Sequence, residues 1–233
     1  EIVYASAAKT PFKKVNSALF NRSYYKQMLN TLKEYIQQKG KPDIIHLHVP
    51  VKMGAGALWL KRKHNIPFVV TEHSSAYFRH IPENYFSRNF YFKLITKKAF
   101  KEAEIVSSPS IWLLERLKQL FKIKQTQLIR NAVDTSVFFP AETNNQKRIF
   151  IHVSMMYPLK NVNGILMALA QLNKVNKDWQ MIFVGPAPVR NRIQAVELGL
   201  DTQINWKGAL AYADVAKEMQ KADLLIHFSK YEN

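Results

Sequence analysis

Short apolar segments alternate with longer amphipathic segments along the whole chain. The longer segments carry apolar residues at helical spacing, which gives each of them a face to bury. The short segments have the composition of buried strands, and they cover residues 43–47, 68–71, 105–107, 127–129, 148–153, 180–184, 204–206 and 224–227. Strands that are separated by single helices predict right-handed βαβ units, and therefore parallel sheets that are covered on both faces.

Three amphipathic segments define their inward faces clearly. These faces consist of Tyr25, Met28, Leu29, Leu32 and Ile36; of Leu113, Leu114, Leu117 and Phe121; and of Ile165, Ala168, Leu169 and Leu172. A polar stretch without any period, residues 141–146, separates the first four strands from the last four. We therefore predict an α/β fold of two Rossmann-like domains, residues 1–137 and 138–233, which meet near residues 135–147. The first sheet is expected to lack its opening strand and the second its closing strands, so both domains would be incomplete in this chain.

The composition narrows the class of protein. The chain has 233 residues, of which 47% are hydrophobic and 22% charged, as is typical of a globular protein. It contains no Cys, which excludes a disulfide scaffold, a thiolate metal site and a cysteine nucleophile. No apolar run reaches the roughly 18 residues that span a bilayer, and the first residues do not have the pattern of a signal peptide. We expect a cytoplasmic protein, and we expect both chain ends, Glu1 and Asn233, to be cut points in a longer sequence.

The net charge of +17 is distributed unevenly. Residues 1–137 hold 23 Lys and Arg against 9 Asp and Glu, a net of +14, whereas residues 138–233 hold 11 against 8, a net of +3. A basic domain of this kind suits an anionic partner, such as phospholipid head groups, nucleic acid or a phosphorylated acceptor. Net charge alone does not identify a partner, so a generally basic, soluble protein remains an alternative.

Residues 77–101 mix aromatic and basic side chains. An amphipathic, basic and aromatic helix is typical of a membrane surface. The cations that would contact anionic lipid there are Arg88, Lys93, Lys97 and Lys98. The same segment also has an ordinary buried stripe, which consists of Tyr91, Leu94, Ile95, Ala99 and Ala103. For the helix itself we favour this plainer interpretation.

Polar residues that directly follow a strand are candidate site residues, because ligands bind at the carboxyl ends of strands in open parallel sheets. In the first domain, His73 follows the strand 68–71, and a functional and a structural role are both open for it. In the second domain, the strand 148–153 leads into Ser154 and then to Lys160 at the expected start of a helix. Backbone N–H groups and a lysine at such a place outline a diphosphate cradle, although the P-loop pattern G-x-x-x-x-G-K-[ST] is absent.

Two further strand ends add to the same edge of the second sheet. Gly185 follows the strand 180–184 and permits a close approach of the backbone, and Glu232 places a carboxylate after the strand 224–227. No Asp-x-Asp pair occurs near a strand end, so no metal site is predicted. The convergence of Ser154, Lys160, Gly185 and Glu232 on one edge indicates a nucleotide site.

Five short motifs resemble, in order, those of the family-4 retaining glycosyltransferases (glycosyl transferase group 1), over nearly the whole chain. They are Asp43-Ile44-Ile45-His46-Leu47-His48, Val70-Thr71-Glu72-His73, Ile129-Arg130-Asn131-Ala132-Val133-Asp134, Val184-Gly185-Pro186-Ala187-Pro188, and Ala222-Asp223-Leu224 with Ser229-Lys230-Tyr231-Glu232-Asn233. The resemblance implies the GT-B architecture. Residues 1–137 would be the C-terminal part of the acceptor-side, N-terminal domain, and residues 138–233 the N-terminal part of the nucleotide-sugar donor domain.

The resemblance also implies roles at the matched positions. Lys160 falls on the lysine that neutralises the donor diphosphate, and Ser154 falls where the family usually has a glycine near those phosphates. His73 falls on the acceptor-domain histidine that faces the transferred sugar. Glu232 falls on the first of two glutamates, and it would bind sugar hydroxyls or phosphate.

Three positions depart from the family pattern. Met155 stands where an arginine is common, Ala132 replaces a glycine, and Ala187 replaces the second glycine of the fourth motif. One charge that would contact the donor phosphates is therefore missing from its usual place.

By resemblance, the protein moves a sugar from a nucleotide-diphosphate sugar to a glycan or lipid-linked acceptor in cell-surface polysaccharide biosynthesis, with retention of the anomeric configuration. It would be a hexosyltransferase-type enzyme without a cofactor, a metal or a nucleic-acid partner, cytoplasmic or peripheral on the cytoplasmic membrane face. The fragment alone is expected to be inactive, because the second glutamate lies beyond Asn233. Two alternatives stay open: a basic nucleic-acid-binding protein, which the charge and the aromatic residues favour, and a nucleotide-sugar 2-epimerase of the same architecture.

Overall fold

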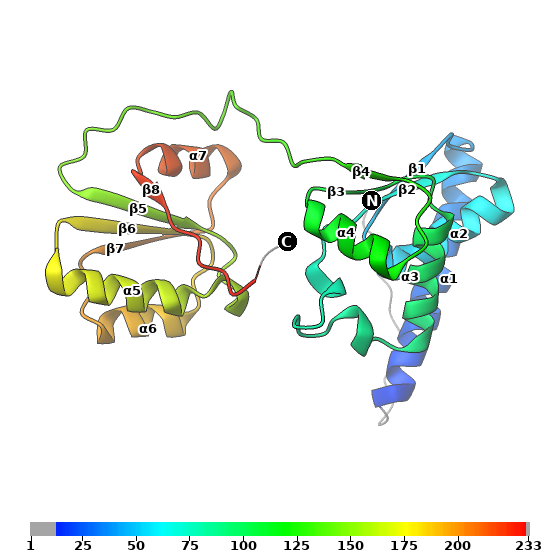
Figure 1. Ribbon diagram of the computed structural model, residues 1–233, viewed down its shortest axis with the longest axis horizontal. Helices are drawn as coiled ribbons and strands as arrows, with labels where there is room; N and C mark the ends of the chain where they lie inside the picture. Colours follow the sequence, from blue (N-terminus) through cyan, green and yellow to red (C-terminus); the bar gives the residue numbers. More distant parts are fainter. Residues whose placement is uncertain (1–12, 232–233) are drawn as a thin grey trace. The chain divides into compact units, whose positions relative to one another are not determined.

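The chain forms two compact units that divide between Asn131 and Ala132 (Figure 1). The computed structural model describes residues 13–231, and in them each unit is built on its own four-stranded parallel sheet. All eight predicted strands are present, with ends displaced by at most two residues. The α/β fold with parallel sheets is therefore confirmed. No helix in the described part is both long and apolar enough to cross a membrane.

The first unit has strands in the order β1-β2-β3-β4, which is also their order along the chain. Right-handed crossovers that all advance in one direction place the connecting helices on one face of the sheet. The elements are α1 (Lys13–Lys39), β1 (Ile45–His48), α2 (Pro50–His64), β2 (Phe68–Thr71), η1 (Ser75–Tyr77), η2 (Tyr85–Ser87), α3 (Phe90–Glu102), β3 (Val106–Ser108), α4 (Ile111–Leu120) and β4 (Thr126–Leu128).

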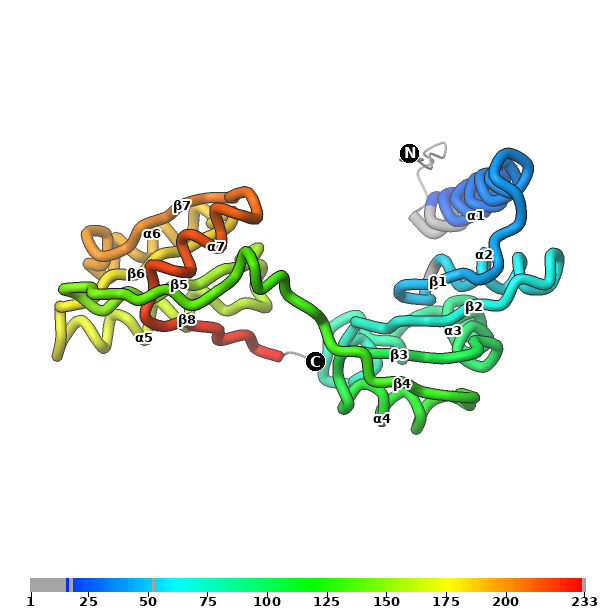
Figure 2. The backbone as a smooth tube through the Cα atoms, turned by 90° about the horizontal axis from the view of Figure 1, so that it is seen from above, coloured from blue at the N-terminus to red at the C-terminus, as the bar shows by residue number. Residues whose placement is uncertain are grey.

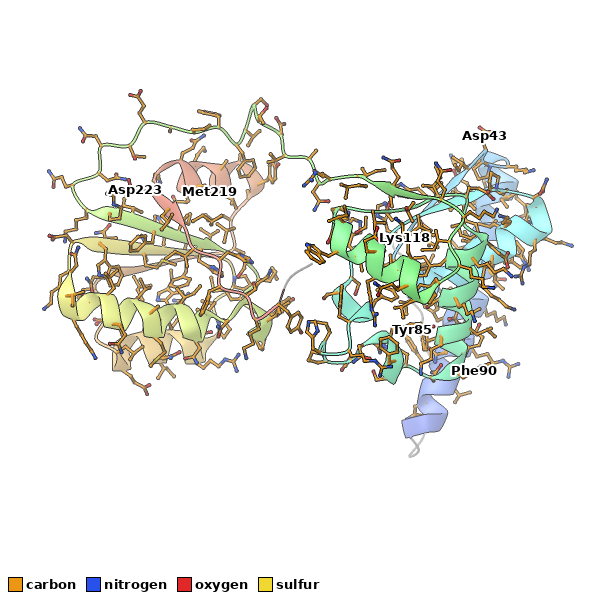
Figure 3. All side chains as sticks on the ribbon, in the orientation of Figure 1. Asp43, Tyr85, Phe90, Lys118, Met219 and Asp223 are labelled. Carbon is orange, nitrogen blue, oxygen red and sulfur yellow. The ribbon has the colours of Figure 1, made fainter. Side chains whose placement is uncertain are left out.

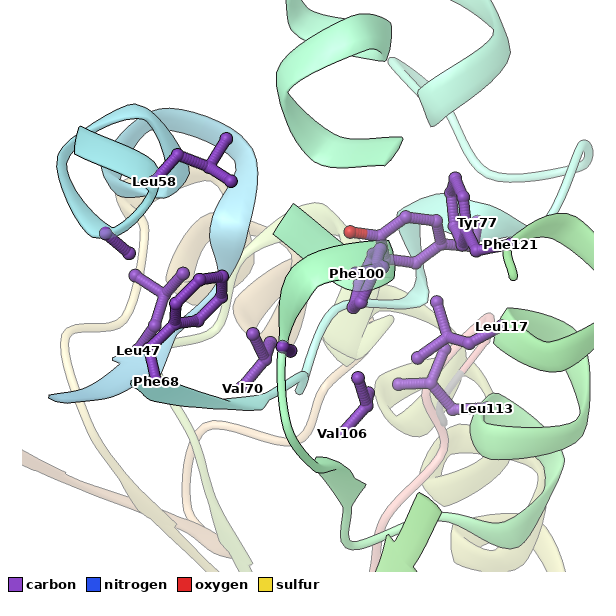
Figure 4. Close-up of a cluster of buried hydrophobic side chains, with 12 residues drawn as sticks. Leu47, Leu58, Phe68, Val70, Tyr77, Phe100, Val106, Leu113, Leu117 and Phe121 are labelled. Atoms are coloured by element: carbon purple, nitrogen blue, oxygen red, sulfur yellow. The ribbon is translucent and has the colours of Figure 1, made fainter. Parts of the chain in front are cut away.

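The core of the first unit lies between the sheet and the helices α2, α3 and α4 (Figure 4). Its centre is aromatic: the rings of Phe100 and Phe121 stack with centroids 4.7 Å apart, and Tyr77 meets Phe100 edge-on at 5.7 Å. Leu113 and Leu117 of α4 are buried in this core, as their spacing predicts. The helix α1 packs outside it, on α2.

The opposite face of the first sheet is polar. His46, Thr71 and Ser107 lie on three adjacent strands and point away from the core. His46 Nε2 lies 2.6 Å from Thr71 Oγ1, which in turn lies 2.6 Å from Ser107 Oγ. The expectation that helices cover both faces is therefore not met in the described part of this unit, because α2, α3 and α4 all follow strands that advance in the same direction.

The second unit has the strand order β7-β6-β5-β8 (Figure 2). Its elements are β5 (Arg148–Val153), η3 (Pro158–Lys160), α5 (Val162–Val175), β6 (Trp179–Val184), α6 (Val189–Glu197), β7 (Ile204–Gly208), α7 (Tyr212–Gln220) and β8 (Leu224–Leu225). The helices α5 and α6 cover one face and α7 the other (Figure 1). Asp223, directly before β8 (Figure 3), accepts a hydrogen bond from the backbone N–H of Ile149 at 2.7 Å, which fixes the start of β8 against β5.

The inward face of α5 is rotated from its predicted place. Ile165 and Leu169 are buried as predicted, but Ala168 is exposed and Leu166 is buried. The buried residues of α5 are Val162, Ile165, Leu166 and Leu169. That spacing of three, four and seven residues forms one continuous stripe along the helix, and Ala168 does not belong to it.

The basic helix α3 is buried at one end and exposed at the other. Asn89 caps it, because its Oδ1 accepts the N–H of Phe92 at 3.0 Å. Ala99 and Ala103 are fully buried, which confirms that part of the predicted stripe, whereas Tyr91 is exposed. Phe90, in the first turn (Figure 3), is 78% exposed. The prediction of a wholly buried stripe is therefore wrong at Tyr91.

Candidate functional site

The second sheet has a topological switch point beside β5. The chain runs from β5 to β6 and β7 on one side, and β8 then pairs with β5 on its other side. At such a point the loops leave the sheet in opposite directions, and a crevice opens at the carboxyl ends of the strands. The loop after β5 and the segment after β8 meet there, because the backbone N–H of Lys230 donates to the carbonyl of Leu159 at 2.9 Å. We therefore place the candidate site of the second unit at this edge.

A buried histidine organises the loop after β5. His152 Nδ1 lies 2.8 Å from the carbonyl oxygen of Ile226, which can only accept, so Nδ1 carries the proton. The other nitrogen, Nε2, therefore accepts the hydroxyl proton of Ser154 at 2.7 Å. Burial lowers the pKa of His152 from its ordinary 6.5; the hydrogen bond to the Ile226 carbonyl raises it in part, and the nearby charges of His227 and Lys160 lower it further. The neutral ring thus joins β5, the loop after it and the segment after β8.

The side chain of Ser154 forms hydrogen bonds that stabilise the loop after β5. Its Oγ donates to His152 and accepts the backbone N–H of Met156 at 2.9 Å. The hydroxyl proton is therefore already used, and Ser154 has no hydrogen to offer to a phosphate. Met156 follows with a φ of 51°, a left-handed conformation that is uncommon for a residue with a long side chain. Ser154 thus lies at the edge where the candidate site is placed, and its contacts set the shape of the loop.

Lys160 lies directly before the N-terminus of α5. It ends the turn η3, and Asn161, with a φ of 51°, is the N-cap of the helix. Lys160 therefore lies two residues before Val162, the first residue of the helix, whereas the sequence predicts it at the helix start. Its Nζ lies 3.5 Å from Nε2 of His227, which also lies 2.8 Å from the hydroxyl of Ser229. The ammonium group is thus held at the meeting point of the two segments.

Gly185 brings two strand-end loops into contact. Its φ is 126°, and a Cβ at this position would lie 1.8 Å from the carbonyl oxygen of Ser154. Its backbone N–H donates to the carbonyl of Gly208 at 2.7 Å. The glycine is therefore required for the approach of backbone to backbone, and the loops after β5, β6 and β7 are tied together through it.

In the first unit, His73 follows β2, at the carboxyl edge of its own sheet. Its Nε2 lies 3.3 Å from Nδ1 of His48, and the two rings are parallel with centroids 5.5 Å apart. The ring of His48 is also 4.1 Å from that of His46. Burial lowers the pKa of His46, and the charges of His48 and His73 add to this. Three histidines therefore gather on and beside the polar face of the first sheet.

A buried carboxylate that the sequence analysis did not select holds His73 in place. Glu72 Oε1 accepts the backbone N–H groups of His73 and Ser74 at 2.9 and 2.8 Å, and its Oε2 accepts the hydroxyl of Tyr77 at 2.7 Å. Burial raises the pKa of Glu72, and these three hydrogen bonds lower it in part. The sequence does contain a sign of this role. Glu72 directly follows a buried strand, and a charge that is buried there requires hydrogen-bond partners.

An apolar cavity of about 430 Å³ lies beside this turn. It is lined chiefly by aromatic and aliphatic side chains, and among them are Val49, Tyr77, Tyr85 and Phe92. Val49 has a φ of 56°, which is strained for a β-branched residue. Strain of this kind concentrates at functional sites, and here it stands between β1 and α2, next to His48.

The predicted site residues therefore fall into two groups. Ser154, Lys160 and Gly185 share the carboxyl edge of the second sheet, and His73 lies in the first unit. Glu232 lies outside the described residues. Within residues 13–231, no group of three His, Cys, Asp or Glu side chains has an arrangement that could hold a metal ion.

Known protein families match the sequence of this chain over almost its whole length. Residues 5–137 match Glycosyltransferase Family 4, and residues 134–233 match Glycosyl transferases group 1. The chain is 22% identical over 209 residues to alpha-monoglucosyldiacylglycerol synthase of Streptococcus pneumoniae, a match that covers 82% of this chain and 47% of that relative.

Two solved structures show the same fold. Sucrose-phosphate synthase of Thermosynechococcus elongatus is 19% identical with a TM-score of 0.75, over 99% of this chain and 60% of that one. HepE of Anabaena, solved in complex with UDP and glucose, is 19% identical with a TM-score of 0.68, over 87% of this chain and 57% of that one. The chain thus spans about half the length of the curated relative and under two thirds of both structures.

The neighbours have the GT-B fold, and more than half of the sequence matches the family-4 glycosyltransferases. The chain therefore belongs to the family-4, group 1 glycosyltransferases.

Proposed function

We propose that the protein transfers a sugar from a nucleotide-diphosphate sugar to a glycan or lipid-linked acceptor in cell-surface polysaccharide biosynthesis, with retention of the anomeric configuration. The observation that carries the proposal is the switch-point edge of the second sheet, where Lys160 stands beside the N-terminus of α5. Backbone N–H groups and a fixed positive charge are together suited to a diphosphate. Membership of the family supports the same assignment.

The chemistry that this edge would perform concerns the leaving diphosphate. When the bond between the anomeric carbon and the diphosphate breaks, negative charge develops on the phosphate. We assign its stabilisation to Lys160 and the N-terminus of α5, which are oriented before the donor arrives. Lys160 is the one charged side chain between Ser154 and Asn161, because Met155 takes the place of the usual arginine. We propose neither a metal nor a cofactor for this step.

The acceptor side of the reaction falls to the first unit. We propose that His73 faces the transferred sugar, with Glu72 as the residue that positions it. Glu232 would bind sugar hydroxyls or phosphate. The pneumococcal relative is named for a product with a diacylglycerol part, which supports a lipid-linked acceptor. The apolar cavity beside Tyr77 is a suitable place for an apolar part of such an acceptor.

We further propose that the first unit binds peripherally to an anionic membrane on its cytoplasmic face. The side chains of Lys93, Lys97 and Lys98 on α3 have no ion-pair partner within residues 13–231, whereas Arg88 pairs with Glu83 at 3.6 Å. Exposed Phe90 and three unpaired ammonium groups on one helix are features of a membrane-surface element.

The test uses the full-length protein with a panel of nucleotide sugars and glycan or lipid acceptors, with mass spectrometry of the products. Transfer of the sugar to an acceptor, with NMR showing the donor's anomeric configuration in the product, is the expected result. Interconversion of the nucleotide sugar without any transfer would identify an epimerase instead. Affinity for RNA that falls steeply with salt, without a response to nucleotide sugars, would identify a nucleic-acid-binding protein.

A further inference from the structure

Besides the apolar cavity of the first unit, the second unit has a polar cavity of about 350 Å³ at the N-terminal ends of α5 and α6. The turn η3 and the first residues of α5 form one wall, and the first two turns of α6 form another. Lys230, from the segment after β8, completes the lining. The cavity shares the loop after β5 with the candidate diphosphate site, but Lys160, Ser154 and Gly185 are not part of its lining.

The cavity contains a buried amide without a partner. Asn191 is 5% exposed, and its backbone N–H donates to the carbonyl of Pro188. Its side-chain amide lines the cavity and makes no hydrogen bond within residues 13–231. Asn161, on the facing wall, likewise caps the helix without a side-chain hydrogen bond. Buried amides normally find partners, so the unpaired amide of Asn191, with the partly exposed amide of Asn161 on the facing wall, points to a ligand that supplies them.

The charged residues of the cavity are both cations. Arg190 and Lys230 line it, and neither has an ion-pair partner in the described part of the chain. No acidic residue is among the described residues that line the cavity. Two unpaired cations and several amides on the walls of one cavity match a ligand with an anionic group and several hydroxyls. A guanidinium group is especially suited to the oxygens of a phosphate.

We propose that this cavity binds a phosphorylated, hydroxyl-bearing small molecule of the sugar-phosphate class. Arg190 and Lys230 hold the phosphate, and the amides of Asn161 and Asn191 bind the hydroxyls. The shared wall makes occupancy of the cavity a constraint on the loop that carries Lys160. The ligand can be a separate molecule or a part of the sugar donor, and both carry the same phosphate and hydroxyl chemistry. Binding of such a ligand to the cavity does not depend on the proposed transferase function.

Calorimetric titration of the full-length protein with glucose 6-phosphate tests the site, with glucose as the uncharged comparison. We expect glucose 6-phosphate to bind and glucose to bind at least about tenfold more weakly, because the charge-assisted hydrogen bonds are then missing. Arg190→Gln is expected to weaken the binding of glucose 6-phosphate by about tenfold, and Asn191→Leu by a similar factor. Circular dichroism confirms that each variant is folded, and Arg190→Gln, at an exposed position, carries the test if Asn191→Leu unfolds.

The matched control is Arg192→Gln on the same helix. The guanidinium of Arg192 lies over the ring of Trp206, 5.7 Å from its centroid, and does not line the cavity. This variant should bind glucose 6-phosphate as the unchanged protein does. Absence of binding at millimolar concentration, or equal weakening by Arg192→Gln and Arg190→Gln, would overturn the proposal.

A titration in the presence of UDP separates the two sources of the ligand. If UDP leaves the affinity for glucose 6-phosphate unchanged, the ligand of the cavity is a separate molecule. If UDP competes with glucose 6-phosphate, and Arg190→Gln abolishes this competition, the ligand is a part of the donor. Failure of the transferase proposal would show instead as absent sugar transfer with the binding of glucose 6-phosphate intact.

Discussion

Lys160 carries the charge of the proposed diphosphate site, since no other residue of its loop is charged. Lys160→Ala should lower kcat/KM of the full-length enzyme by roughly two to three orders of magnitude, the scale seen when one preorganised group is removed from developing charge. Lys160→Arg should recover part of the activity. The measurement is steady-state kinetics with the donor varied.

The control for this variant is Lys174→Ala in the last turn of the same helix. Lys174 is exposed and lies at the opposite end of α5, so its loss should leave kcat/KM near that of the unchanged enzyme. If Lys160→Ala retains normal donor affinity and rate, Lys160 is a solvated lysine and the phosphate site lies elsewhere.

Gly185 permits a backbone contact that no other residue allows. In Gly185→Ala, the new Cβ would overlap the carbonyl of Ser154, and the φ of 126° would be strained as well. We expect the free energy of unfolding of the second unit to fall by about 2 kcal/mol or more, in the upper range for single substitutions. Chemical denaturation monitored by tryptophan fluorescence measures the change.

Gly199 offers the matched comparison for this substitution. Its φ of 66° is also positive, but a Cβ there would meet no atom within 4 Å. Gly199→Ala should therefore cost only the conformational penalty, about 1 kcal/mol. Equal losses in the two variants would show that the contact with Ser154 does not constrain the loop.

The strands β5 and β8 are joined through a histidine that must stay neutral. The pKa of His152 lies below its ordinary 6.5 because the ring is buried, so below pH 6.5 the unfolded chain binds a proton that the folded chain does not. The free energy of unfolding of the second unit should therefore fall as the pH drops from about 6.5 towards the folded-state pKa. One proton limits the slope to about 1.4 kcal/mol per pH unit.

Thermal unfolding between pH 8 and pH 5 measures this dependence. His152→Gln should be less stable at pH 8 and should lose less on acidification than the unchanged protein. His64→Gln, which lies in the first unit, should keep the original slope for the second unit. A slope that is the same in all three proteins would exclude His152 as its source.

The helix α3 is the element on which the membrane proposal rests. Replacing Lys93, Lys97 and Lys98 by Gln should weaken binding to anionic vesicles by about 3 kcal/mol at low salt, since each basic residue near the surface contributes about 1 kcal/mol. Co-sedimentation at low and high salt measures the binding. The triple replacement of Lys147, Lys174 and Lys177 in the second unit keeps the same net charge change and should have little effect. Equal partitioning of the unchanged protein onto neutral vesicles would remove the electrostatic argument.

At the scale of elements, features that depend on a local sequence pattern could be predicted, and features that depend on long-range contacts could not. Each strand was predicted from a short segment rich in apolar residues, and the core positions Leu113 and Leu117 follow from spacing within one helix. The hydrogen bond of His152 joins it to a carbonyl 74 residues away, and no local pattern encodes such a pair. Gly185 was selected because a glycine follows a strand, but its reason, the carbonyl of Ser154, required the fold. In α5 the period was correct, and only the inward direction, which the sheet determines, was missed.

At the scale of the whole molecule, the matched relatives are longer than this chain. The activity of the 233-residue chain alone is therefore open to a test. It should show little or no sugar transfer, because the family resemblance assigns part of donor binding to a second glutamate after Glu232. The assay compares the fragment with the full-length enzyme at equal concentration, with circular dichroism to confirm that the fragment is folded. Turnover by the fragment at a comparable rate would show that the donor site is complete without that residue.

The contact between Gly185 and Ser154 has a consequence for protein engineering. Because the two backbones touch, neither loop can be lengthened, shortened or recombined with that of a relative without a matching change in the other. A library that randomises one of these loops alone would consist mainly of unstable variants. Exchange of donor preference is therefore best attempted by grafting both loops as a unit, or by substituting only side chains that leave this contact intact, such as the exposed Met155.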